Sequence, residues 1–202
     1  YPIGVEGRKG SLGSYYSVRD YCAVDPCLGT MEDFDAFVAE AHRLGMKVLL
    51  DWIANHTARD ARWVTEKPAS WYERDASGAP AVPWDWTDTA KLNYAEREVW
   101  RAQGDAMEFW VREHGVDGFR CDMAMLVPIE FWNETAQRLR RVKPDLFMLA
   151  EAEETYLFDG GAFDACYAWE MHHLMNDVAQ QRVRVTSLRD YIYADRRRYP
   201  RS

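Results

Sequence analysis

The 202-residue sequence lacks several features that would assign it to a common class of protein. It has no run of about 18 apolar residues, so we expect no membrane-spanning segment. Acidic residues exceed basic ones by 33 to 25, and the net charge of -8 argues against a nucleic-acid surface. No predicted strand is followed by a glycine-rich phosphate-binding motif. The composition is compatible with neutral and with cationic ligands.

Cysteine is scarce as well. The four cysteines, Cys22, Cys27, Cys121 and Cys166, do not have metal-ligand spacing. Cys121 and Cys166 fall in predicted strands, where a free cysteine packs as a small apolar residue. Cys22 and Cys27 can pair across a loop, so the redox compartment is undecided. No signal peptide is recognisable, and the sequence assigns no localisation.

Aromatic residues, in contrast, are abundant at 14% of the chain, with nine Trp and eleven Tyr. Most of them are expected in the core, but flat aromatic faces at a cleft are also a common way to hold sugar rings. The hydrophobic fraction of 48% is enough for one domain with a substantial core.

Hydrophobic patterns alternate between strands and helices along the chain. Residues 1–29 are predicted to form a long glycine-rich loop, and residues 57–89 an irregular excursion rich in Pro, Trp and Asp. Strands are predicted at 47–53, 116–124, 146–150 and 165–169, with helices over 30–45, from a cap at Asn93 to Gly115, over 128–143, 171–181 and 187–197. The continuous apolar runs favour strands buried on both faces. This order predicts a parallel sheet, either a (β/α) barrel or a doubly wound open sheet.

Polar residues follow the first three predicted strands: Asn55 and His56, then Asp122, then Glu151. In parallel strands these ends meet at one edge, which is where barrel enzymes carry their functional groups. Arg120 shares a strand face with Asp122 and is predicted to lower the pKa of that carboxyl, as a nucleophile needs, although a structural ion pair is the common alternative. Glu151 follows five apolar residues, which predicts a raised pKa and the role of an acid.

Three stretches carry a family resemblance. Residues 51–56 (DWIANH), 118–122 (GFRCD) and 149–151 (LAE) resemble, in order and spacing, three sequence regions of the α-amylase family of glycoside hydrolases. Residues 16–21 also resemble the loop of that family that carries a sugar-stacking tyrosine. The resemblance implies Asp122 as nucleophile, Glu151 as general acid/base and Arg120 as the partner of the nucleophile. It implies substrate contacts from Tyr16, His56 and Asp51.

The resemblance also implies a fold, part of an eight-stranded (β/α)8 TIM barrel. Residues 1–202 correspond to about strands three to six, and residues 57–89 to a short form of the subdomain inserted after the third strand. The family's Asn-His-Asp motif on strand seven, which supplies a third acidic residue, has no match here. We therefore expect the remainder of the barrel to be missing and these 202 residues to be inactive alone.

For cofactors the expectation is none. Many members of the family have a calcium-ligating His four residues after the nucleophile, where this chain has Leu126. Asn93 stands where an Asp is common in the family. Only Asn55 of the implied calcium ligands is present.

The expected substrate is an α-glucan or oligosaccharide related to starch or maltodextrin. Hydrolysis, transglycosylation and isomerisation share their first step in this family, and the sequence does not distinguish them. Substrate length and linkage are equally unassigned. Two alternatives are a non-catalytic α-amylase-like module that binds sugar or a partner, and an unrelated α/β enzyme whose carboxylates bind a metal.

Overall fold

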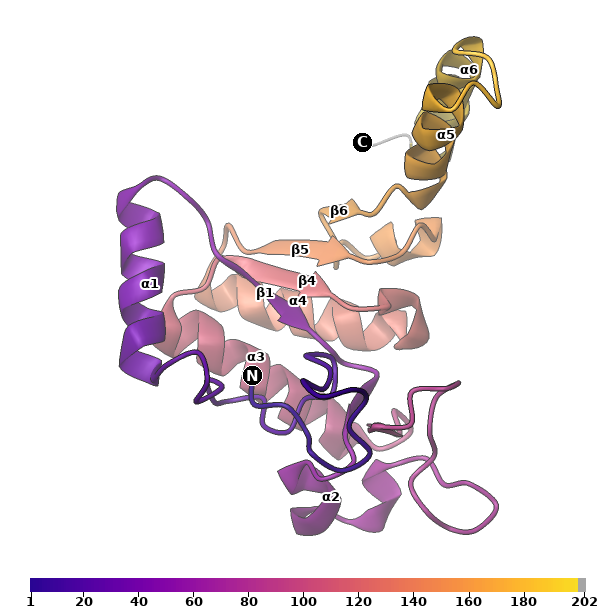
Figure 1. Ribbon diagram of the computed structural model, residues 1–202. Helices are drawn as coiled ribbons and strands as arrows, with labels where there is room; N and C mark the ends of the chain where they lie inside the picture. Colours follow the sequence, from indigo (N-terminus) through magenta and orange to yellow (C-terminus); the bar gives the residue numbers. More distant parts are fainter. Residues whose placement is uncertain (200–202) are drawn as a thin grey trace.

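The computed structural model describes residues 1–199 and contains a four-stranded parallel sheet (Figure 1). Its strands, in spatial order, are β1 (Leu49–Trp52), β4 (Gly118–Cys121), β5 (Phe147–Ala150) and β6 (Ala165–Cys166). The long helices are α1 (Met31–Arg43), α3 (Arg97–His114), α4 (Ile129–Val142), α5 (Trp169–Ala179) and α6 (Thr186–Arg198). The predicted parallel sheet with alternating helices is confirmed.

Local signals explain two of the helix boundaries. Thr30 and Asp33 form a reciprocal capping box at the start of α1, and α3 ends at Gly115, whose φ of 69° suits a glycine. The prediction that Asn93 caps α3 is wrong. Its side chain accepts a hydrogen bond from Ala95 N in the turn before the helix, which begins only at Arg97.

The two faces of the sheet differ sharply in exposure. Phe119, Cys121, Met148 and Ala150 are fully buried on the face that α3 and α4 cover (Figure 1). On the other face Leu49 and Phe147 are 36% and 39% exposed. The expectation of strands buried on both faces is therefore wrong here, because none of the described elements packs over this second face.

Gly118 sets the spacing of the two central strands. A Cβ built at this position would lie 1.9 Å from the Phe147 carbonyl oxygen and 2.9 Å from Leu49 Cδ2. Only glycine allows β4 and β5 to approach in this register, which pairs Gly118 with Phe147 and Arg120 with Leu149.

The segment 57–89 has more structure than predicted. The short strands β2 (His56–Ala58) and β3 (Thr89–Lys91) pair antiparallel at its two ends, and α2 (Arg62–Glu66) and the 3₁₀ helix η1 (Ala69–Trp71) lie between them. Trp71, Tyr72, Ala90, Leu92 and Val99 form a small hydrophobic cluster of their own there. The existence of a separate inserted subdomain stays a prediction.

Helices α5 and α6 form a hairpin that projects from the sheet beyond β6 (Figure 1). The 3₁₀ helices η2 (Ala124–Leu126) and η3 (Thr155–Phe158) follow β4 and β5. Within residues 1–199 no helix combines the length and apolarity needed to cross a membrane. Cys121 and Cys166 lie in β4 and β6 as predicted, while Cys22 and Cys27 are exposed and not disulfide-bonded.

Candidate active site

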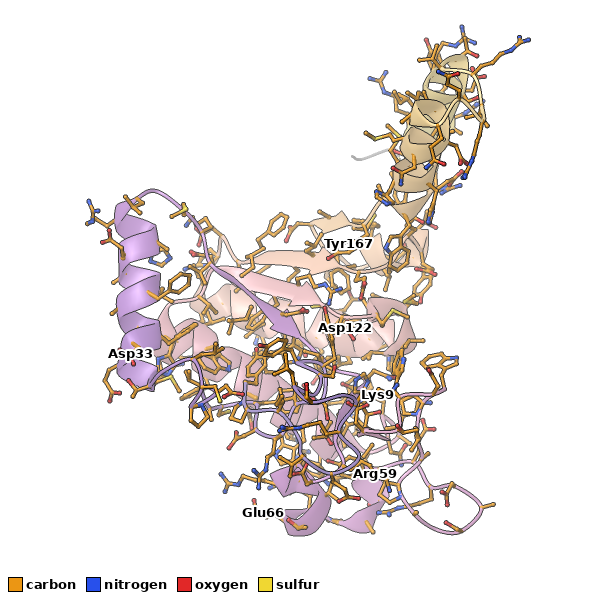
Figure 2. All side chains as sticks on the ribbon, viewed as in Figure 1. Lys9, Asp33, Arg59, Glu66, Asp122 and Tyr167 are labelled. Carbon is orange, nitrogen blue, oxygen red and sulfur yellow. The ribbon has the colours of Figure 1, made fainter. Side chains whose placement is uncertain are left out.

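Backbone hydrogen bonds continue past the ends of the strands and fix the candidate catalytic residues. Asp122 N donates to Trp52 O at 2.9 Å, and Glu151 N donates to Cys121 O at 3.0 Å. Met123 then takes a left-handed conformation with φ of 42°, which ends the strand and the predicted alternation of side chains. Asp122 and Glu151 are thereby presented at the same carboxyl end of the sheet, where Figure 2 labels Asp122.

Arg120 connects the acidic residues of this edge. Its Nη1 donates to Asp51 Oδ1 at 2.7 Å and to Asp122 Oδ1 at 2.9 Å, and its Nη2 lies 2.8 Å from Glu151 Oε2. The Arg120 side chain is only 14% exposed. One cation on β4 therefore holds three carboxylates that come from three neighbouring strands.

The electrostatics of Asp122 differ from the sequence prediction. Burial raises the pKa of Asp122 to about 7; the hydrogen bonds and charge of Arg120 oppose this rise, and the nearby Glu151 carboxyl adds to it. The prediction that Arg120 holds this pKa low is wrong, because one cation shared among three carboxylates does not offset the loss of water around Asp122.

Glu151 does not occupy the apolar surround that the sequence suggested. Its Oε2 accepts a hydrogen bond from Met123 N at 3.0 Å in addition to its contact with Arg120. The apolar residues that precede it alternate between the two faces of β5, so that Met148 and Ala150 are fully buried whereas Phe147 lies on the exposed face. Its environment is polar and shared with Asp122.

His56 is 2% exposed and lies in the wall of the site. Burial lowers the pKa of His56 to about 4, against a hydrogen bond with the Tyr16 backbone, so the ring is neutral at neutral pH. Tyr21 positions this segment by donating from its hydroxyl to Ile53 O at 2.6 Å or to His56 O at 2.8 Å. A neutral, fixed imidazole suits hydrogen bonding to an uncharged ligand.

These residues surround a cavity of about 320 Å³. Its lining consists of Lys9, Ser14, Tyr16, His56, Trp86, Asp88, Thr89, Asp122, Met123 and Glu151. Of the residues predicted from sequence, the cavity brings together Tyr16, His56, Asp122 and Glu151. Asp51 and Arg120 do not line it. Arg120 supports it through its contacts with Asp122 and Glu151, and Asp51 through its contact with Arg120.

Sequence reasoning missed the contribution of the segment 57–89 to this cavity. Trp86 places its ring 5.2 Å from that of His56, and Trp84 lies 4.7 Å from Trp86 while being 65% exposed. Asp88 is 3% exposed, with no hydrogen-bond partner for Oδ2 among the described residues. Only the density of Trp and Asp in the segment pointed to such a role.

The residues implied for calcium do not form a suitable cage. The amide of Asn55 faces His56 Nδ1 at 3.2 Å, and Asn93 uses both ends of its amide on the backbone of Ala95 and Ser70. Calcium needs six to eight oxygen ligands. In the described part of the chain no three His, Cys, Asp or Glu side chains converge on a point fit for a metal. The expectation of no cofactor stays a prediction.

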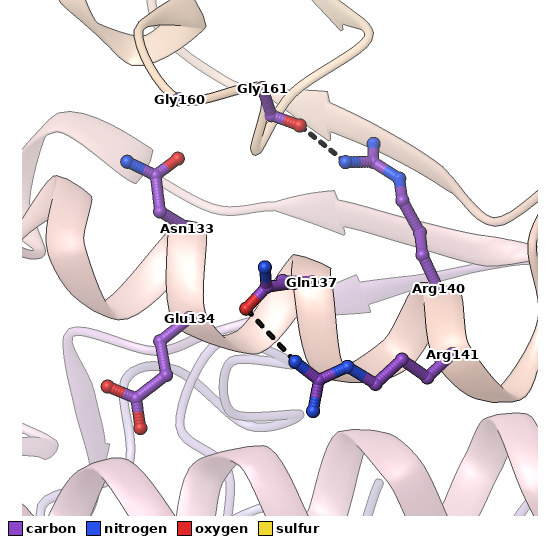
Figure 3. A pocket seen from close by; sticks show the side chains of 7 residues that line it. All are labelled: Asn133, Glu134, Gln137, Arg140, Arg141, Gly160 and Gly161. Atoms are coloured by element: carbon purple, nitrogen blue, oxygen red, sulfur yellow. Dashed lines mark hydrogen bonds between the residues drawn. The ribbon is translucent and has the colours of Figure 1, made fainter.

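A second hollow, of about 510 Å³, lies away from this chemistry on the outer side of α4 (Figure 3). Its lining includes Asn133, Glu134, Gln137, Arg140, Arg141, Gly160 and Gly161. Arg140 holds the adjoining loop through the Gly161 carbonyl and Asp164, and Arg141 contacts Gln137. Arg140 therefore attaches the loop after β5 to the helix layer.

The fold and the site together define a class of protein: a parallel sheet layered with helices, with two neighbouring carboxyl groups at the carboxyl ends of its strands. The family model of the alpha-amylase catalytic domain matches this chain in two overlapping segments, residues 10–87 and 71–199. The chain belongs to the α-amylase family.

Individual relatives agree with this assignment. The chain is 35% identical over 173 residues to an alpha-1,4-glucan:maltose-1-phosphate maltosyltransferase of Arcanobacterium haemolyticum, covering 75% of this chain and 25% of the relative. It is 32% identical over 164 residues to alpha-amylase 3 of Dictyoglomus thermophilum, covering 67% of this chain and 32% of the relative. The chain thus spans a quarter to a third of these two proteins.

Solved structures show the same fold. The crystal structure of a noncanonic maltogenic alpha-amylase, AmyB, from Thermotoga neapolitana matches with a TM-score of 0.91 and 38% identity, covering all of this chain and 47% of that one. An alpha-amylase from Lactobacillus plantarum matches with a TM-score of 0.89 and 35% identity over 96% of this chain and 49% of that one. The structure is consistent with part of a (β/α) barrel, as predicted.

Proposed function

We propose that this chain carries the two reacting carboxyl groups of a retaining glycosidase or transglycosidase that acts on α-glucosidic bonds of starch-like or maltodextrin-like glucans. The observation that carries the proposal is the single guanidinium of Arg120, which contacts Asp122 at 2.9 Å and Glu151 at 2.8 Å beside the cavity. The relatives, whose names include alpha-amylases and a glucan maltosyltransferase, support the substrate class.

In this proposal Asp122 attacks the anomeric carbon and Glu151 protonates the leaving oxygen. Two carboxyl groups that share one cation and little water retain a proton between them near neutral pH, as the raised pKa of Asp122 indicates. Positive charge that develops on the sugar beside Asp122 favours its ionised form, which leaves the proton on Glu151. Water or a second sugar then attacks the glycosyl-enzyme.

The remaining residues hold the sugar. His56 is neutral and donates or accepts a hydrogen bond to a hydroxyl group, and Tyr16, 42% exposed, offers its ring to the sugar face. Asp51 supports the constellation from β1 through its 2.7 Å contact with Arg120. No step requires a metal or a cofactor.

The test compares leaving groups, using the protein expressed at the full length that its gene encodes. Asp122→Asn should abolish turnover of every α-glucoside, because no covalent intermediate can form. Glu151→Gln should lose turnover of natural glucans by several orders of magnitude but still react with α-glucosyl fluoride, whose leaving group needs little protonation. Azide should then release an α-glucosyl azide.

Glu153→Gln is the matched control, because Glu153 also follows β5 but accepts a hydrogen bond from Glu170 N at the start of α5. Its rates on both substrates should stay near those of the unaltered enzyme. Equal losses on glucan and fluoride in Glu151→Gln, with no azide product, would show that Glu151 is not the acid/base.

The 202 residues taken alone are proposed to be inactive, because they contain no Asn-His-Asp motif and therefore lack the acidic residue that this motif supplies. Cleavage of an α-glucoside by the purified 202-residue chain, lost in Asp122→Asn, would overturn this. A non-catalytic sugar-binding module is the second candidate. It predicts glucan binding with no turnover at any length of the protein.

A further inference from the structure

Arg120 has one more hydrogen-bond partner, which the proposed reaction does not use. Its Nε donates to the Tyr167 hydroxyl oxygen at 3.1 Å, while both terminal nitrogens contact carboxylates. Tyr167 follows β6, and its backbone N–H donates to Ala150 O at 3.0 Å. The backbone pairing of β5 therefore extends to Tyr167, which lies at the same end of the strands as Asp122 (Figure 2).

The Nε–H of an arginine has a special place in its geometry. A guanidinium is planar and projects five N–H groups in a fixed fork, so a bond at Nε together with the contacts at the two Nη atoms fixes the plane of the whole group. The carboxylates contact only the two Nη atoms. If the guanidinium rotates, Nη1 and Nη2 exchange their carboxylate partners, and equivalent contacts form again. The bond to Tyr167 selects one orientation among these.

An uncharged hydrogen-bond acceptor suits the Nε–H of Arg120. Three carboxylates, of Asp51, Asp122 and Glu151, already share the single positive charge of Arg120. A fourth carboxylate at Nε would add repulsion, whereas a phenol oxygen accepts the hydrogen bond with no change in charge. The aromatic rings of Tyr16 and Tyr167 also flank the guanidinium carbon, at 5.8 and 5.4 Å.

We propose that Tyr167 is a positioning residue that fixes the plane of the Arg120 guanidinium, so that Nη1 faces Asp122 and Nη2 faces Glu151. The effect of this on turnover rests on the proposed function. The orientation of Arg120 does not, and it can be measured without any reaction.

The first measurement is the solvent-exchange rate of the Arg120 Nε–H, followed by NMR in protein expressed at the full length that its gene encodes with ¹⁵N-labelled arginine. Tyr167→Phe removes only the hydroxyl and should speed this exchange at least tenfold. Tyr193→Phe, which removes a hydroxyl from a residue that is 58% exposed on α6, should leave it unchanged. An unchanged rate in Tyr167→Phe would overturn the proposal.

The second measurement is the pH profile of kcat/KM for an α-glucoside. A less ordered Arg120 stabilises the Asp122 carboxylate less, so the acidic limb should move to higher pH in Tyr167→Phe, with kcat reduced about tenfold and KM little changed. A purely structural role would lower activity at all pH values without moving the limb, and that result would also overturn the proposal. If the unaltered protein has no activity, the proposed function fails while the exchange measurement still decides the role of Tyr167.

Discussion

The two ends of strand β4 each carry a buried aspartate, and the two have opposite environments. Asp117, 3% exposed, lies at the amino end, where Lys143 Nζ at 2.8 Å, Lys47 Nζ at 3.2 Å and His42 Nε2 at 2.7 Å surround it. Asp122, 6% exposed, lies at the carboxyl end and shares one guanidinium with two other carboxylates. Only four residues lie between Asp117, which has more cations than anions around it, and Asp122, which has more anions than cations around it.

The pKa values of the two groups follow from this difference. Burial opposes ionisation of Asp117, but hydrogen bonds from Lys143, Val48 N, His42 and Lys47 outweigh it and lower the pKa. At Asp122 burial prevails and raises the pKa to about 7. An aspartate therefore stabilises the fold at the amino end of β4. At the carboxyl end the ionised form of the aspartate is unfavourable, as is common at functional sites.

The largest expected effect comes from replacing each aspartate by asparagine. Asp117→Asn leaves the partly buried Lys143 without its counter-charge and should lower the free energy of unfolding by about 3 kcal/mol. Asp122→Asn relieves repulsion and should raise the free energy of unfolding at pH 8 by about 1–3 kcal/mol while abolishing turnover. Urea denaturation of both variants, with turnover assayed beside it, measures the contrast.

The contrast between the two ends of β4 is contradicted if Asp122→Asn lowers the free energy of unfolding as much as Asp117→Asn does. Asp117→Asn should also keep substantial turnover in whatever fraction stays folded, because Asp117 lies at the opposite end of β4 from the cavity. Loss of turnover in folded Asp117→Asn would assign the amino end a role in the reaction that the structure does not suggest.

The pH dependence of the free energy of unfolding should have opposite signs at the two ends of β4. The folded pKa of Asp117 is below the unfolded value of about 3.9, so its contribution is present above pH 4 and is lost as the pH falls below it. The folded pKa of Asp122, about 7, is above the unfolded value, so the folded state binds more protons and stability falls between about pH 4 and pH 7. Denaturation midpoints across pH 4 to 8 should show this decline, and Asp122→Asn should remove most of it. A decline that persists in Asp122→Asn would assign it to another group.

The smallest expected effect separates the two lysines at Asp117. The Lys143 side chain is 21% exposed and that of Lys47 is 66% exposed. Lys143→Met should lower the free energy of unfolding by about 1–2 kcal/mol, and Lys47→Met should lower it less, because exposed ion pairs contribute little. Thermal unfolding of the two variants measures the difference, and equal losses would mean that burial of Lys143 does not strengthen its pair.

Much of the candidate site could be predicted from sequence because its chemistry follows directly after strands. Apolar runs located β1, β4 and β5, and the parallel order brought Asp122 and Glu151 to one edge. The same rule, applied to the residue after β6, selects Tyr167, but a strand of only two residues gives a weak pattern. No periodic pattern in the sequence predicted that Trp86 and Asp88 of the segment 57–89 would line the cavity, because irregular loops are placed by contacts distant in sequence.

The sequence by itself determined the order of elements, the cap of α1 at Thr30 and the placement of carboxylates at strand ends, because these depend on local spacing and on the geometry of parallel strands. Only the tertiary structure decided how charge is shared there. Arg120 is two residues from Asp122 but also meets Asp51 and Glu151, which are distant in the chain, and water is excluded by elements from the whole molecule. The pKa of a carboxyl depends on all these neighbours at once, so its direction could not follow from the nearest charge in the sequence.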